Sequence, residues 1–102
     1  MITARARILA AVRHQEADRV PIDFGGMRSS GVQAIAYNRL KTHLGMAEGR
    51  TLLFDIMQQL ALPEPLVLDR LGADAVPLPR LPIGLDPKQP RWKPWRLADG
   101  SP

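Results

Sequence analysis

The sequence predicts an α/β chain whose parallel sheet is incomplete. Two short apolar runs, at residues 20–24 and 73–78, have the composition of β-strands. Helical patterns precede, separate and flank them at about residues 4–14, 31–44 and 63–71. Strands that alternate with helices are typical of parallel sheets. Because two strands leave such a sheet with open edges and uncovered faces, we expect the chain to be part of a larger domain.

Start and stop signals support each predicted helix. Thr3 precedes the first helix and is a favourable N-cap, and Ser29 or Ser30 can cap the second. Gly45 and Gly72 follow the last apolar residues of the second and third helices, where glycine commonly ends a helix. These signals predict where the three helices lie.

The remaining segments have weaker patterns. Between the second and third helices lies an apolar patch at 52–54, followed by Asp55, which can cap a short helical turn through residues 58–60. Beyond residue 79 the chain is rich in proline and has no stable period. We therefore divide it into residues 1–79, which hold the helices and strands, and residues 80–102, an extended or mobile loop cut off before the next strand that adds little to the core.

Composition excludes several classes of protein. The chain has 102 residues, 45% of them hydrophobic, and a net charge of +4. It has no cysteine and two histidines, so disulfides and a structural zinc site of the Cys/His kind are excluded. No apolar run approaches the roughly 20 residues of a membrane span. We expect a cytoplasmic protein with no membrane partner.

The stretch D-R-V-P-I-D-F-G-G at residues 18–26 is the main candidate for a functional site. Its D-F-G triplet lacks the other kinase motifs upstream, so a kinase is excluded. An apolar strand that ends in an acid and two glycines instead fits the ligand-binding end of a barrel strand. There Asp23 would face a ligand, and Gly25 and Gly26 would let the backbone approach it. The alternative is structural: the glycines turn the chain, and Asp23 caps the turn or pairs with an arginine.

Four stretches resemble the uroporphyrinogen decarboxylase superfamily. They are A-R-I-L-A-A-V-R-H-Q-E-A-D-R-V-P-I-D-F-G-G, S-G-V-Q-A-I-A-Y-N-R-L-K-T-H-L-G, F-D-I-M-Q-Q-L-A and V-L-D-R-L-G-A-D-A-V, and they cover most of residues 4–78. The resemblance is closest to the branch of corrinoid-linked methyltransferases. It implies the N-terminal part of a TIM (β/α)8 barrel, with residues 20–24 and 73–78 as the first two strands, and a chain that alone is inactive.

Departures from the decarboxylases favour the methyltransferase branch. After the first strand those enzymes carry a motif with two arginines that grips substrate carboxylates, whereas this chain reads G-G-M-R-S-S-G, with Arg28 alone. Near the position of their catalytic aspartate stands Arg80. The substrate-binding candidates are therefore Asp23, Gly25, Gly26, Arg28 and Arg80, and no catalytic residue or metal ligand is assigned. The resemblance implies a small-molecule substrate or a corrinoid protein as partner of a longer relative, and zinc bound by residues late in its barrel.

Other residues have both a structural and a functional interpretation. Gln58 and Gln59 either bind a ligand or form a solvated face. Asp74 begins a predicted strand and is expected to be a cap or an ion pair. His14 and His43 lie at helix ends, where they interact favourably with the helix dipole.

The alternative from another class is a small basic nucleic-acid-binding protein. It would use the helices at 4–14 and 31–44, and we otherwise expect Arg5, Arg7 and Arg13 of the first helix to be solvated. Trp92 and Trp95 lie among Arg91, Lys93 and Arg96, so they either stack on bases or pack a loop.

Overall fold

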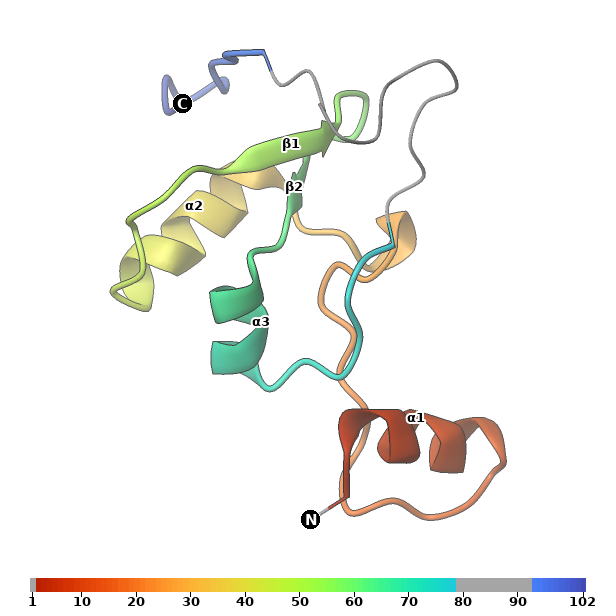
Figure 1. The fold of residues 1–102 in the computed structure, drawn as a ribbon. Helices are drawn as coiled ribbons and strands as arrows, with labels where there is room; N and C mark the ends of the chain where they lie inside the picture. Colours follow the sequence, from red (N-terminus) through yellow and green to blue (C-terminus); the bar gives the residue numbers. More distant parts are fainter. Residues whose placement is uncertain (1, 79–92) are drawn as a thin grey trace.

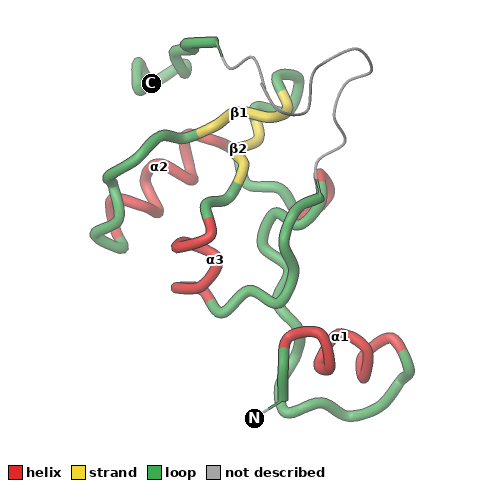
Figure 2. The backbone as a smooth tube through the Cα atoms, viewed as in Figure 1, coloured by secondary structure: helices red, strands yellow, loops and turns green. Residues whose placement is uncertain are grey.

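The computed structural model describes residues 2–78 and 93–102, and within them it forms a small α/β chain (Figures 1 and 2). The helices are α1 (Ala4–Val12), α2 (Ala34–His43) and α3 (Pro65–Leu71), and a short 3₁₀ turn spans Arg28–Ser30. The strands are β1 (Leu52–Asp55) and β2 (Leu60–Leu62). Within the described ranges, no helix is long and apolar enough to cross a membrane.

The three predicted helices are present, with ends shifted by a few residues. The Thr3 hydroxyl accepts a hydrogen bond from the Ala6 N–H at 3.1 Å, so the predicted N-cap of α1 is confirmed. Gly72 adopts the left-handed conformation after α3, with φ 67°, as expected of a glycine stop. The predicted cap of α2 is wrong, because the Gln33 side chain caps the helix by accepting from the Ile35 and Ala36 N–H groups. Ser30 instead belongs to the 3₁₀ turn.

The sheet differs from the prediction in both place and direction. Strands β1 and β2 pair antiparallel as a hairpin, with Leu52 opposite Leu62 and Leu53 opposite Ala61. The short turn between them replaces the helical turn predicted after Asp55, although the Asp55 carboxylate does accept a hydrogen bond from the Gln58 N–H at 2.9 Å. A hairpin needs only a short loop, so its pairing is local and its entropic cost is low.

The predicted parallel strands at 20–24 and 73–78 are wrong, and with them the predicted barrel fragment. Neither segment is a strand, although both are extended and run side by side (Figures 1 and 2). The Asp74 N–H donates to the Ile22 carbonyl at 2.8 Å, and the Ile22 N–H is taken by the Asp74 carboxylate instead of a carbonyl. Pro21 and Pro77 have no N–H to offer a ladder. The segments therefore touch without forming a sheet.

The core lies where α2, the hairpin and α3 meet. Its buried members are Ala34, Tyr37, Ala61, Val67 and Leu97, and Phe24, Val32, Ile35, Met46, Leu53 and Leu71 pack around them. Leu97 is only 6% exposed, so the prediction that the C-terminal segment adds little to the core is wrong at this residue. The prediction for residues 79–92 lies outside the described residues.

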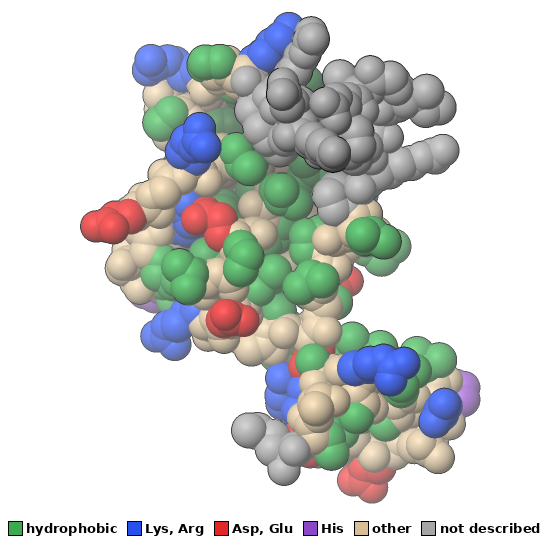
Figure 3. Space-filling model, viewed as in Figure 1, with side chains coloured by type: hydrophobic (Ala, Val, Ile, Leu, Met, Phe, Trp, Pro, Cys, Tyr) green, Lys and Arg blue, Asp and Glu red, His purple; other side chains and the backbone are tan. Residues whose placement is uncertain are grey.

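Helix α1 stands apart from this core. The space-filling view shows it as a smaller lobe joined to the rest by a narrow neck (Figure 3). Arg7 is the buried residue of α1, contrary to the expectation that it is solvated. Its guanidinium bridges the two parts, because it donates to Asp18 and to Asp74. Charged hydrogen bonds, more than apolar contact, therefore attach α1 to the body of the chain.

Candidate functional site

The loop that follows residue 22 brings four of the five predicted site residues together. One carboxylate oxygen of Asp23 accepts a hydrogen bond from the Gly26 N–H at 2.8 Å, which closes a tight turn. The Gly25 N–H donates to the Ser30 carbonyl at 2.9 Å, so the loop folds back on itself. Arg28 begins the 3₁₀ turn of the same loop. Arg80, the fifth candidate, lies outside the described residues.

Both glycines are required by close packing. Gly25 has φ 75°, and a Cβ at this position would lie 2.5 Å from the Cγ of Pro63. A Cβ on Gly26 would lie 2.5 Å from an Asp23 carboxylate oxygen and 3.3 Å from the Cβ of Ala75. The loop is thus pressed against Pro63, which directly follows β2, and against the 73–78 segment. The glycines serve this packing, and nothing further is needed to explain them.

Arg28 is held by a buried acid. Its Nε lies 3.1 Å from Oδ2 of Asp55, at the end of β1. The Arg28 side chain is 68% exposed, whereas that of Asp55 is 7% exposed. The second oxygen of Asp55 accepts the Gln58 N–H, which fixes the carboxylate in place. Among the described residues, no hydrogen bond is made by the terminal nitrogens of Arg28, so the guanidinium presents its outer edge to solvent.

An ion cluster that the sequence predicted only in part, through the expected ion pair at Asp74, lies at the neck between α1 and the body. Asp74 is at its centre, with its side chain 2% exposed, and it accepts from Arg7 and, at 2.7 Å, from Arg19. Asp18 accepts from Arg7 at 2.6 and 2.8 Å. The hydrogen bond from Arg7 lowers the pKa of Asp18 to about 2. The Ile22 N–H and the two guanidiniums lower the pKa of Asp74, so the expected ion pair at Asp74 is confirmed.

A second buried cluster joins α2 to the start of α3. Lys41, 3% exposed, donates to the Glu64 carboxylate at 2.6 Å and lies 5.3 Å from the centre of the Tyr37 ring. The Tyr37 hydroxyl accepts from the Glu64 N–H at 2.9 Å and donates to the Glu64 carboxylate at 3.2 Å. Burial raises the pKa of Tyr37 to about 12.

The sequence carried a signal for this cluster. Ala34, Tyr37 and Lys41 lie three and four residues apart, so they share one buried face of α2. A lysine on such a face needs an acidic partner, because a buried charge is costly unless it is paired. The partner itself could not be read from spacing, since Glu64 is 23 residues away.

Helices α1 and α2, which the alternative would use to bind nucleic acid, each have one cationic side chain buried in the protein. Arg7 of α1 and Lys41 of α2 are buried in the ion pairs above, and neither side chain is placed to contact a phosphate. Trp95 is 55% exposed, and Trp92 lies outside the described residues. His14 follows the end of α1 and His43 is the last residue of α2, as expected.

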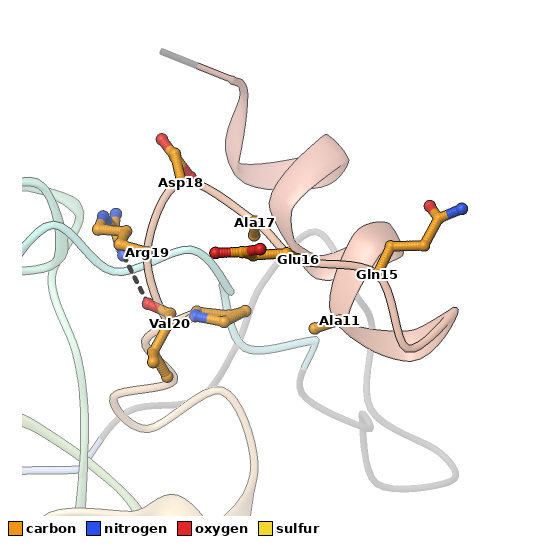
Figure 4. A pocket seen from close by; sticks show the side chains of 8 residues that line it. Ala11, Gln15, Glu16, Ala17, Asp18, Arg19 and Val20 are labelled. Atoms are coloured by element: carbon orange, nitrogen blue, oxygen red, sulfur yellow. Dashed lines mark hydrogen bonds between the residues drawn. The ribbon is translucent and has the colours of Figure 1, made fainter.

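The described residues form no cluster of potential metal ligands. Residues 2–78 and 93–102 contain no group of three or more His, Cys, Asp or Glu that could hold a metal ion. An open hollow of about 450 Å³ lies beside the end of α1 (Figure 4). Arg19 lines it and donates to the Val20 carbonyl at 3.0 Å, while Gln15 points away from the other lining side chains. The hollow includes none of the predicted site residues.

Comparison of the chain with protein-family models, with curated proteins and with solved structures gives no match. The resemblance to the uroporphyrinogen decarboxylase superfamily therefore stays a prediction from the sequence.

Proposed function

We propose that the chain is part of a uroporphyrinogen decarboxylase-like enzyme and that Arg28 binds an anionic group of its substrate. Methyl transfer to or from a corrinoid protein is the proposed chemistry, with tetrapyrrole decarboxylation as the runner-up. The resemblance of residues 4–78 supports the class of enzyme. The ion pair between Arg28 and Asp55 is the single structural observation that supports the anion site.

The geometry of this pair suits anion recognition. A guanidinium that is paired through Nε leaves its two terminal nitrogens to a ligand, and in this planar group they match the two oxygens of a carboxylate or a phosphate. The ion pair with the buried Asp55 restricts the Arg28 side chain, so less side-chain entropy is lost when a ligand binds. The exposed edge of Arg28 leaves room for a ligand to approach from solvent.

The proposal assigns no reaction step to the described residues. Because they offer no set of metal ligands, no zinc chemistry is placed on them. Arg28 stands alone where the decarboxylases carry two arginines, which favours the methyltransferase branch. The contribution of these residues is to bind and orient one anionic group, and we expect the 102-residue chain by itself to be inactive.

A binding measurement tests the anion site directly. The chain is titrated with uroporphyrin, an octacarboxylate, and with hydroxocobalamin, and heat is measured by calorimetry. Hydrogen bonds to charged groups contribute about 1.5–3 kcal/mol, so Arg28→Gln should weaken binding on the order of tenfold or more. Arg39→Gln is the matched control, because Arg39 is an exposed arginine on α2 and should leave the affinity unchanged.

Activity of the complete gene product tests the class of enzyme. We expect transfer of the methyl group of methylcobalamin to a thiol, which releases cob(I)alamin and is measured by its absorbance, and a loss of this activity in Arg28→Gln. If the complete gene product instead releases carbon dioxide from uroporphyrinogen, its reaction is tetrapyrrole decarboxylation. A complete gene product that has neither activity, together with equal affinities for Arg28→Gln and the parent chain, would refute the proposal.

A further inference from the structure

Asp74 makes hydrogen bonds to both backbone groups of a single residue in the neighbouring segment. Its N–H donates to the Ile22 carbonyl at 2.8 Å, and its carboxylate accepts the Ile22 N–H at 2.9 Å. The carboxylate is also held by Arg7 of α1 and by Arg19, and Arg7 is in turn paired with Asp18. Every charged partner that the structure gives this carboxylate thus fixes it against residue 22.

This double contact fixes the register between residues 20–24 and 73–78. Extended side chains alternate in direction, so a slip of one residue would turn each side chain to the opposite face. In the observed register Gly26 lies against Ala75, the next residue after Asp74. The turn between Asp23 and Gly26 follows directly, and the same loop carries Arg28. The position of the loop therefore depends on the contact between Asp74 and Ile22.

We propose that Asp74 is a positioning residue, which places the Asp23–Arg28 loop through its two hydrogen bonds to Ile22 and is itself held by Arg7 of α1. It links α1, which stands apart from the core (Figure 3), to the loop of the anion site. Its importance for a ligand rests on the proposed function, whereas its effect on the loop does not. No other described acid contacts both α1 and residue 22.

The test compares two variants that each remove one carboxylate from Arg7. Asp74→Asn replaces the carboxylate that accepts the Ile22 N–H with a neutral amide, whereas Asp18→Asn weakens the pairing with Arg7 and leaves the Asp74 carboxylate unchanged. Amide chemical shifts of the 102-residue chain are recorded by NMR without ligand. We expect the Ile22 and Gly26 amides to shift in Asp74→Asn and to stay in place in Asp18→Asn. Unmoved amides in Asp74→Asn, or equal shifts in both variants, would overturn the proposal.

If Asp74→Asn does not fold, Asp74→Glu tests the positioning role in its place. It keeps the charge and moves the carboxylate by one methylene, so the fold should persist with shifted Ile22 and Gly26 amides. If this variant also unfolds, Asp74 supports the whole fold and the positioning role is wrong.

Uroporphyrin titration separates this inference from the proposed function. Shifted amides in the Asp74 variants with no effect of Arg28→Gln would refute the anion site alone. Unmoved amides in the Asp74 variants, together with weaker uroporphyrin binding by Arg28→Gln, would refute the positioning role alone.

Discussion

Replacing Tyr37 with phenylalanine should destabilise the chain by about 2 kcal/mol. The Tyr37 hydroxyl accepts from the Glu64 N–H at 2.9 Å and donates to the Glu64 carboxylate at 3.2 Å, and the residue is fully buried. Phenylalanine keeps the ring and the packing but leaves the Glu64 N–H without this acceptor. An unsatisfied buried polar group costs about 1–3 kcal/mol. The Lys41–Glu64 ion pair remains, which limits the loss.

Urea denaturation followed by circular dichroism measures this change. For a domain of this size, 1 kcal/mol corresponds to roughly 4–8 °C in Tm, so a decrease of about 8–16 °C should accompany it. Thr42→Val is the matched control on the same helix, because the Thr42 hydroxyl donates to the Asn38 carbonyl on an exposed face. Its effect should stay within about 0.5 kcal/mol. Equal stabilities of Tyr37→Phe and the parent chain would refute the role of this hydroxyl.

The same variant should also change the response to alkaline pH. Burial raises the pKa of Tyr37 from 10.0 to about 12, so the folded state disfavours the tyrosinate. The corresponding stability is fully present below pH 10 and is lost as the pH rises from 10 to 12. Phenylalanine does not titrate, so Tyr37→Phe has no such loss. The free energy of unfolding of the parent chain should therefore fall toward that of Tyr37→Phe between pH 10 and 12. A constant difference between the two proteins would contradict the assigned pKa.

Three further variants test other contacts. Leu97→Ala should cost about 2–5 kcal/mol in urea denaturation, whereas Leu78→Ala, at a side chain 94% exposed, should change little; equal effects would place Leu97 outside the core. Gly25→Ala should destabilise by about 1–3 kcal/mol more than Gly45→Ala, because both have positive φ but only Gly25 has neighbours that its Cβ would meet; equal thermal stabilities would contradict this packing. Asp18→Asn should flatten the loss of stability as the pH falls from 3.8 toward 2, since the pKa of Asp18 is depressed in the folded state; parallel acid-denaturation curves would refute that pairing.

Local signals predicted the helices well because their physical causes are local. The Thr3 hydroxyl caps α1 three residues away, and Gly72 ends α3 in the left-handed conformation that glycine adopts most readily. The hairpin was missed because its turn lacks an Asn-Gly or Asp-Gly signal. Gln59 takes the positive φ, at 56°, and this conformation is uncommon for a residue other than glycine.

Predicted site residues on the loop lie together as expected, but the residues that hold them were missed. Asp55, the anchor of Arg28, was interpreted only as the cap of a helical turn, and it does accept the Gln58 N–H. Pairs such as Arg7 with Asp74 span 67 residues, and no periodicity relates residues at that separation. Buried charges are predicted from a sequence only where a helix face reveals them, as it does for Lys41.

The failure of the predicted strands has a cause within the same residues that suggested them. An apolar run favours a buried strand, but a strand also needs an N–H at alternate positions to join a ladder. Pro21 removes one such donor beside Val20, and the Ile22 N–H is bound by the Asp74 side chain. Asp74, which was expected to be a cap or an ion pair at the start of a strand, thus takes the place of a main-chain acceptor. The two segments consequently remain extended and adjacent, and Val20 stays 80% exposed.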